Sequence, residues 1–441
     1  MRKVSTALSC AVALASGIIG CSSSTNKNGS SAGSSSGSGS SSGASGGSGG
    51  TSAGQGDTAT CSTGTLFAGD PQSTADSNAR AANHDPIIPT SDTLAPLQWG
   101  NIIFVGTDIY TRETAGSIWR IDTTTSPMTE TLVAGQVSEQ DKSALEYHVN
   151  DTCANTKLTF EFGLGAGTDG SLYVSDWLGN SVLKITHPND AGCHVDVLAG
   201  NAANGTFDGE AFNAGTILDG NGLSAEFAAP TQLVVDSSNN VYVQDGTDAS
   251  GHVVRKIDAS GKVTTIATLG TDPGVITKIS EFAVNGTTLY AAGKDGSSGN
   301  YIVQIDTVGA GPNNKITTIV GGRGKFDPID SSASAHFGGF AYTGSNFYVA
   351  GTGYIWKVSL SGSVTLVAGI GEVSAAGFPP SDYNAKGTNT AATLKMPYDQ
   401  SSEGSGDSGA YSHLAYHNGV LYFTGKGNGV SSFVEAITCG Q

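Results

Sequence analysis

The sequence predicts an all-β protein: a six-bladed β-propeller of four-stranded antiparallel blades, whose last blade is closed by an N-terminal strand. A hairpin pattern centred on a tyrosine recurs six times beyond residue 90. The composition, with 63 Gly and only 13% charged residues, favours turns and short strands over long helices. A lone strand-like segment, GTLFAG at 64–69, precedes the first repeat.

The first 20 residues have the pattern of a targeting segment. Arg2 and Lys3 precede an apolar run that ends at Ile19 and is too short for a membrane-spanning helix. The run ends in IIGC at 18–21, which resembles the lipobox of bacterial lipoproteins. The resemblance implies cleavage before Cys21 and a diacylglycerol on its sulfur. The alternative is an ordinary secretory signal peptide followed by an incidental cysteine.

Residues 21–60 are expected to be a lipidated cysteine followed by a flexible linker. Between 22 and 56 nearly every residue is Ser, Gly, Ala or Thr, which cannot bury apolar area. Such a coil reaches about 30–35 Å on average. Position 22 is Ser rather than Asp, so the inner-membrane retention signal is absent and the outer membrane is favoured. We therefore expect a monomeric propeller over 61–441, anchored in the cell envelope by lipid and facing the periplasm or the surface.

The six repeats share one order of strands. A first apolar stretch and a turn rich in Gly, Asn, Asp or Ser lead to a second strand, which is a hairpin signature. The second strands carry Tyr110, Tyr173, Tyr242, Tyr290, Tyr348 and Tyr422. A third strand follows, such as SIWRID at 117–122, and then a fourth, such as TLVAG at 131–135. The sixth repeat has no fourth strand of its own, and a closed ring explains why 64–69 stands apart: it completes that blade.

The repeats resemble NHL repeats. The best match is DGNGLSAEFAAPTQLVVDSSNNVYVQD at 219–245, continued by VVRKIDASGKVTTIA at 253–267. The resemblance extends over about 64–439, strongly in the second and third repeats and loosely elsewhere, and it implies the same closed ring. The alternative is a solenoid or a sandwich built from repeated hairpins.

The cysteines allow a disulfide framework. Cys10 leaves with the signal peptide and Cys21 is the predicted lipidation site, so an even number remains in an oxidising compartment. Four cysteines allow three pairings. Cys61 and Cys439 flank the broken turn of the closing blade, which favours a Cys61–Cys439 bridge, and Cys153–Cys193 follows by elimination. The second pair requires the loop that carries Cys153 to drape over the rim of its blade.

Registering the first strands by their tyrosines places one residue of each repeat at the channel mouth: Asn101, Gly163, Gln232, Glu281, Gly339 and His413. This layout resembles that of gluconolactonases and paraoxonases. The resemblance implies Ca²⁺ or another divalent cation on Glu281 and Asn101, with Gln232 as a further oxygen ligand. His413 would be a base, or a ligand for a softer metal. Two positions are Gly and only one is acidic, so the alternative is a polar channel without chemistry.

Charge and loops complete the functional hypothesis. The formal net charge is −17, with 21 basic and 38 acidic residues and no basic run after residue 3, which argues against nucleic acid. Long loops at 136–160, 201–230, 323–335 and 370–411 are expected on the face where the first strands begin. We expect a membrane-anchored binding module for an envelope protein, a glycan or a small ligand, rather than an enzyme. The alternatives are a metal-dependent hydrolase of the lactonase type and a purely structural envelope protein.

Overall fold

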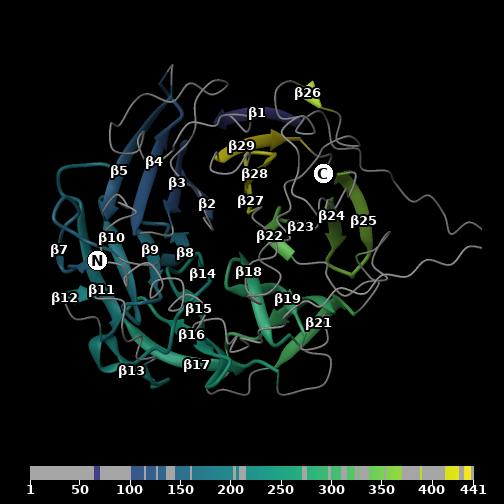
Figure 1. The fold of residues 1–441 in the computed structure, drawn as a ribbon. Coiled ribbons are helices and arrows are strands. Elements are labelled where there is room, and N and C mark those ends of the chain that lie inside the picture. Colours follow the sequence, from purple (N-terminus) through teal and green to yellow (C-terminus); the bar gives the residue numbers. More distant parts are fainter. Residues whose placement is uncertain are drawn as a thin grey trace, which may run out of the picture.

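Six antiparallel sheets form a closed ring in the computed structural model of the chain (Figure 1). The structure describes residues 64–69, 101–113, 116–125, 128–135, 145–158, 161–201, 205–207, 215–270, 276–295, 299–308, 315–322, 326, 337–351, 354–369, 388–389, 413–426 and 432–438. One short 3₁₀ helix, Gly222–Ser224, interrupts the strands. No helix of this part is long and apolar enough to cross a membrane.

The first three blades follow one another along the chain. Blade 1 contains β2 (Ile102–Val105), β3 (Asp108–Glu113), β4 (Ser117–Asp122) and β5 (Thr129–Gly135). Blade 2 contains β8 (Glu161–Ala166), β9 (Leu172–Asp176), β10 (Ser181–Thr186), β11 (His194–Gly200) and, outermost, β7 (Asp151–Thr152). Blade 3 contains β14 (Leu233–Val235), β15 (Val241–Thr247), β16 (Gly251–Ile257), β17 (Lys262–Thr268) and, outermost, β13 (Gly220–Asn221).

The other three blades complete the ring. Blade 4 contains β18 (Lys278–Asn285), β19 (Thr288–Lys294), β20 (Asn300–Ile305) and β21 (Ile316–Gly321). Blade 5 contains β22 (Phe337–Tyr342), β23 (Asn346–Gly351), β24 (Tyr354–Ser359) and β25 (Val364–Gly369). Blade 6 contains β27 (Leu414–His417), β28 (Val420–Lys426), β29 (Ser432–Ile437), β1 (Gly64–Gly69) and β26 (Thr388–Asn389). A separate pair joins β6 (Leu145–Tyr147) to β12 (Gly205–Phe207), so the loops before and after blade 2 are linked.

The predicted ring closure is confirmed. β1 pairs antiparallel with β29, with Thr65 opposite Ala436 and Gly69 opposite Phe433. In Figure 1 the purple β1 lies beside the yellow β29, at the outer side of blade 6. The N-terminal segment therefore covers an edge that the C-terminal strands would leave open.

The hydrophobic core lies between the blades. Six clusters of buried side chains each draw on two neighbouring blades, and every interface around the ring has one. At the closing interface, Ile102, Ile109 and Ile121 of blade 1 pack against Val434 of blade 6. Burial of apolar area at all six interfaces is the main stabilising contribution to the ring.

The tyrosines that mark the repeats are core residues at these interfaces. Tyr242 is fully buried, and its hydroxyl donates a hydrogen bond to Asp236 Oδ2 at 3.1 Å. The other oxygen of Asp236 accepts the backbone N–H groups of Ser238 and Asn240, which closes the turn between β14 and β15. Burial and the neighbouring carboxylate raise the pKa of Tyr242, so the phenol stays protonated.

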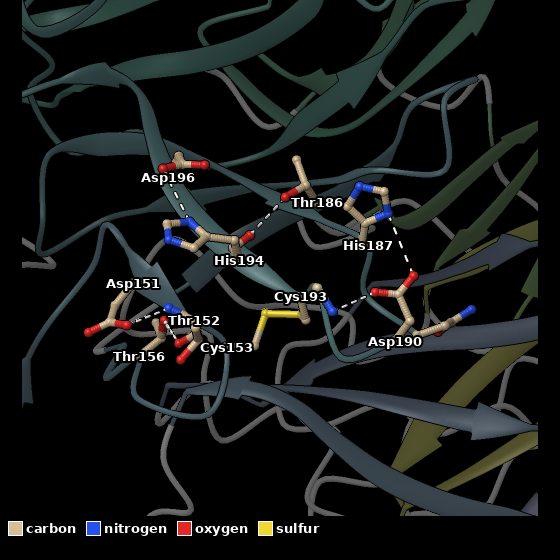
Figure 2. Close-up of a disulfide and its surroundings, with 12 residues drawn as sticks. Asp151, Thr152, Cys153, Thr156, Thr186, His187, Asp190, Cys193, His194 and Asp196 are labelled. Carbon is tan, nitrogen blue, oxygen red and sulfur yellow. Dashed lines mark hydrogen bonds and ion pairs between the residues drawn. A yellow bond between two sulfur atoms is a disulfide. The ribbon is translucent and has the colours of Figure 1, made fainter.

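The Cys153–Cys193 disulfide is confirmed, and the route of the loop that carries Cys153 is resolved. This loop runs along the outer edge of blade 2, where β7 pairs with β11 and places Thr152 opposite His194. The Cys153 N–H donates to the Cys193 carbonyl at 3.0 Å, and the two Cα atoms are 5.4 Å apart (Figure 2). Cys61 and Cys439 lie outside the described residues, so their pairing stays a prediction.

The loop that enters blade 3 is held by one buried cation. Arg255 Nη1 bonds Asp245 Oδ2 at 2.7 Å, and Nη2 bonds Asp219 Oδ1 at 3.0 Å. The same guanidinium donates to the Glu226 and Leu218 carbonyls and lies 4.8 Å from the centre of the Phe227 ring. Apart from Leu218, these residues belong to the NHL-like motif at 219–267, so much of that motif serves to hold the loop that enters blade 3.

Candidate functional site

Four of the six residues predicted at the channel mouth bond to one another and form a central cluster: Asn101, Gln232, Glu281 and His413. Asn101 Nδ2 donates to Glu281 Oε1 at 3.0 Å and lies 3.4 Å from Gln232 Oε1. His413 Nδ1 lies 3.0 Å from Glu281 Oε2. Blades 1 and 4 face each other in a ring of six, so the bond from Asn101 to Glu281 crosses the centre (Figure 1).

Backbone register brings these side chains together. In blade 1, Thr111 follows the repeat tyrosine and pairs with Ile102, and the cluster residue Asn101 directly precedes Ile102. The other three cluster residues hold the same position in their blades. In blade 4 the register of β18 shifts between Ile279 and Glu281. An extra residue in a strand redirects the side chain that follows it. The register of the tyrosines was therefore sufficient to find the cluster.

The two glycine positions add no side chain to the centre, and Gly163 serves packing. Corresponding shifts precede Gly163 in β8 and Gly339 in β22. A Cβ on Gly163 would lie 2.5 Å from the Leu233 backbone nitrogen and 2.8 Å from the Thr231 carbonyl oxygen. Only Gly therefore allows blade 3 to approach blade 2 this closely. Glycine at 163 and 339 adds no side chain, so the cluster consists of four residues.

The cluster is almost closed to solvent. Asn101 and Glu281 are each 6% exposed and His413 is 7% exposed, whereas Gln232 is partly exposed. A buried carboxylate is costly unless hydrogen bonds replace its hydration. Both oxygens of Glu281 have such a partner, one in Asn101 and one in His413. Because three of its members are buried, the cluster presents little area to a large surface.

One buried atom of the cluster has no partner. Asn101 Oδ1 makes no hydrogen bond within the part of the chain that the structure describes. The amide nitrogen of the same side chain is directed at Glu281. A second contact with Glu281 occupies Nδ1 of His413, so Nε2 of that ring is the nitrogen that could meet another partner. An unsatisfied buried acceptor costs about 1–3 kcal/mol. The arrangement therefore suits a ligand that brings an N–H or O–H donor to Asn101 Oδ1.

A set of supporting residues could not be identified by the sequence analysis. Ser175 Oγ accepts the Gly163 N–H at 2.7 Å, and Thr424 Oγ1 accepts the His413 N–H at 3.1 Å. Gln244 occupies the same position in blade 3 and is 2% exposed. One sequence feature could have pointed to them: each is a polar residue two places after a repeat tyrosine, where a buried strand favours an apolar residue. These side chains hold the starts of the first strands.

The described residues give limited support to the predicted cation. They contain no group of three or more His, Cys, Asp and Glu side chains that could hold a metal ion. Ca²⁺ takes 6–8 oxygen ligands, and the cluster offers a single carboxylate. Asn101 presents its nitrogen to Glu281, so a cation shared by these two residues requires the amide to turn over. The predicted metal site on Glu281 and Asn101 stays a prediction.

Other predicted features lie outside the described residues. They include Cys21, the linker and most of the loops at 323–335 and 370–411. In the loop at 201–230, Asp219 and Glu226 bond Arg255 and support blade 3, whereas β12 pairs with β6.

Comparisons with known proteins find similar solved structures, but they do not identify a function. No family model matches the chain, so membership of the NHL family stays a prediction, and no curated protein matches it either. A solved protein of unknown function from Bacteroides thetaiotaomicron is 11% identical with a TM-score of 0.50, over 86% of this chain and 76% of that one.

Two enzymes are among the similar structures. A gluconolactonase from Xanthomonas campestris is 10% identical with a TM-score of 0.44, over 87% of this chain and 96% of that one. Virginiamycin B lyase from Staphylococcus aureus is 12% identical with a TM-score of 0.40, over 80% and 82%. Both TM-scores lie below 0.5, so neither likeness establishes a fold or an activity for this chain.

Proposed function

We propose that the protein is a membrane-anchored, extracytoplasmic binding module that holds a small hydrogen-bond donor at the central cluster. The donor is a free small ligand, or a group that projects from a glycan or an envelope protein. The observation that carries the proposal is the buried, unpartnered Oδ1 of Asn101 beside a buried carboxylate. A donor at this atom recovers the free energy that the empty acceptor costs.

The charge of the site favours donors over anions. Glu281 is the only carboxylate of the central cluster, and the chain as a whole carries a formal net charge of −17. An anionic ligand would have to approach this buried carboxylate in a medium of low dielectric constant, where repulsion is strong. Amines, amides and polyols are therefore the classes to test first.

The proposed location follows from the N-terminal sequence. Lipidation of Cys21 and the Ser/Gly-rich linker would hold the ring at the outer membrane while leaving it free to meet partners. Palmitate labelling of the wild type and of Cys21→Ala tests the anchor. Label in both chains to the same extent would count against it.

A thermal-shift screen of the purified protein tests the binding proposal. Amines, amides and polyols are added in turn, and each hit is repeated on Asn101→Leu, which keeps the branched shape of the side chain but removes both the acceptor and the bond to Glu281. A ligand that binds only the folded state raises the melting temperature by mass action. We expect hits that disappear in Asn101→Leu, and hits of equal size in both chains would place the ligand elsewhere. Asn239→Gly, at the other end of the first strands, is the matched control.

A metal-dependent hydrolase is the second candidate. The contact between Glu281 and Nδ1 of His413 orients the imidazole as a carboxylate orients a general base. A divalent cation would supply Lewis acidity there, held by Glu281 and the oxygens of Asn101 and Gln232. Metal analysis with melting curves in the presence and absence of chelator tests this candidate. One stoichiometric ion that is lost in Glu281→Ala would justify a lactone and ester screen, and an unchanged melting curve in chelator would remove its support.

A further inference from the structure

In blades 2 and 6 a hydroxyl of the second strand accepts the backbone N–H at the start of the first strand, whereas blades 4 and 5 have an alanine at that position. In blade 2, Ser175 Oγ accepts the Gly163 N–H, and in blade 6, Thr424 Oγ1 accepts the His413 N–H. The corresponding residue of blade 4 is Ala292, which pairs with Glu281 and has no polar side chain. Glu281 therefore lacks the side-chain hydrogen bond that Gly163 and His413 receive, and within the described part of its own blade only backbone pairing with β19 holds it.

Gln244 supplies a substitute from the neighbouring blade. Its Oε1 accepts the Ile279 N–H at 2.6 Å, across the interface between blades 3 and 4. Ile279 lies two residues before Glu281, at the register shift that directs the Glu281 side chain inward. The bond is buried, which makes it strong and costly to lose.

The same residue also fixes Gln232. Gln244 Nε2 donates to Thr231 Oγ1 at 2.8 Å, and its backbone N–H donates to the Gln232 carbonyl at 2.9 Å. Ser175 Oγ donates to the Thr231 carbonyl, so the start of β14 is held from blade 2 as well. One amide side chain thus bonds both the segment that carries Gln232 and the segment that carries Glu281.

We propose that Gln244 is the positioning residue of the central cluster, setting the place of Glu281 and, through it, of His413. Its consequence for binding rests on the proposed function, but its effect on geometry does not. Gln244→Met keeps the volume and removes both side-chain hydrogen bonds. Glu281 then moves relative to His413, because the residue of β19 opposite Glu281 is Ala292, whose side chain cannot replace the bond to Ile279.

The test uses the imidazole ¹⁵N signals of His413 in the full-length protein without ligand. The signals are assigned by their loss in His413→Gln, and the other seven of the 8 histidines serve as internal references. We expect Gln244→Met to shift the His413 signals and to leave the references in place. Asn239→Gly is the control, because Asn239 also bridges two blades, through Thr168, and glycine tolerates its φ of 60°. It should lower stability without shifting His413.

Rescue by a second substitution separates positioning from general loosening. Ala292→Ser places a hydroxyl where Ser175 stands in blade 2, so Gln244→Met with Ala292→Ser should return the His413 signals toward their wild-type positions. Wild-type His413 signals in Gln244→Met would overturn the proposal, and so would a shift that Ala292→Ser does not reverse. If Gln244→Met does not fold, Thr231→Val removes the contact that orients the Gln244 amide toward Ile279, so a smaller shift of the His413 signals is expected, and unshifted signals would count against the proposal.

Ligand binding then distinguishes this proposal from the proposed function. With the best hit of the thermal-shift screen, Gln244→Met should bind about 2- to 10-fold more weakly, as expected for the loss of one buried hydrogen bond. Shifted His413 signals with unchanged affinity would keep Gln244 as a positioning residue and would refute the cluster as the ligand site. Unshifted signals would refute the role of Gln244 whatever the affinity.

Discussion

Arg255 is the centre of a buried charged network in blade 3. It is fully buried, it bonds one buried and one half-exposed aspartate, and it also donates to two backbone carbonyls. Removing one partner of a buried ion pair leaves the other charge uncompensated. The sequence does not reveal this network, because Arg255 lies in the strand after Asp245 and their pairing depends on the fold.

Arg255→Met is therefore expected to destabilise the protein by about 3–5 kcal/mol. The measurement is the free energy of unfolding in urea. Lys262→Ala, an exposed cation on the next strand, is the control and should change the free energy by less than about 0.5 kcal/mol. Equal losses in the two variants would show that the buried network contributes little.

Asp151 gives a prediction of pH dependence at the same scale. The hydrogen bond with His148, the Thr152 backbone N–H and the Asn155 amide lower the pKa of Asp151 from 3.8 to about 2. A depressed pKa means that the folded state binds the proton less tightly than the unfolded state. The stabilisation is thus present above about pH 4 and is lost as the pH falls through 2.

Melting temperatures of the wild type and of Asp151→Asn between pH 2 and 6 check this expectation. The wild type should be the more stable chain above pH 4, and the difference should vanish near pH 2. A difference that stays constant down to pH 2 would mean that the carboxylate of Asp151 is not the source of the stabilisation.

At the scale of elements, the least expected feature is the loop at 145–158 that carries β7, called the strap below. The sequence placed Cys153 in a loop that enters the first strand, far from Cys193, and left the bridge to elimination. The structure resolves this because the loop first runs along β11, where Thr152 and Asp151 pair with His194 and Val195. Before and after β7, Tyr147, Val149 and Leu158 pack into the interface between blades 1 and 2.

Replacing Cys153 and Cys193 by Ser together should cost about 4 kcal/mol, by the loop-entropy estimate for the 40-residue separation of the two cysteines. Hydrogen exchange locates the effect. Amides of β7 should exchange faster in the double variant, whereas those of β15 and β16 keep their rates. Unchanged protection of β7 would show that strand pairing alone holds the strap.

The sequence predicted the blades and the members of the central cluster because both depend on register within one repeat. The tyrosines fix the pairing of the first two strands, and pairing fixes which residue begins each first strand. The role of Gln244 was out of reach, since its bond to Ile279 depends on how closely two blades approach. The unpartnered Oδ1 of Asn101 could not be predicted from the sequence either, because it depends on the orientation of the side-chain amide.

At the scale of the whole molecule, stability rests on a closed ring in which every blade packs against two others. β1 shields β29, and the interface between blades 1 and 6 has its own apolar cluster. Deleting residues 64–69 should lower the melting temperature and expose a strand edge that pairs with other molecules. Size-exclusion chromatography would then show dimers or aggregates. Deleting residues 30–50, within the predicted linker, should change neither the melting temperature nor the oligomeric state. An equal fall in melting temperature in the two deletions would contradict closure by β1.

The central claim is that the ring presents one small-ligand site at the cluster of Asn101, Gln232, Glu281 and His413. Isothermal titration of the full-length protein with the strongest hit of the thermal-shift screen tests it most directly, in the wild type and in Asn101→Leu. The account predicts a single site in the wild type and an affinity at least about tenfold weaker in the variant, as expected for a buried acceptor lost beside a carboxylate. Equal affinity in the two proteins would contradict it.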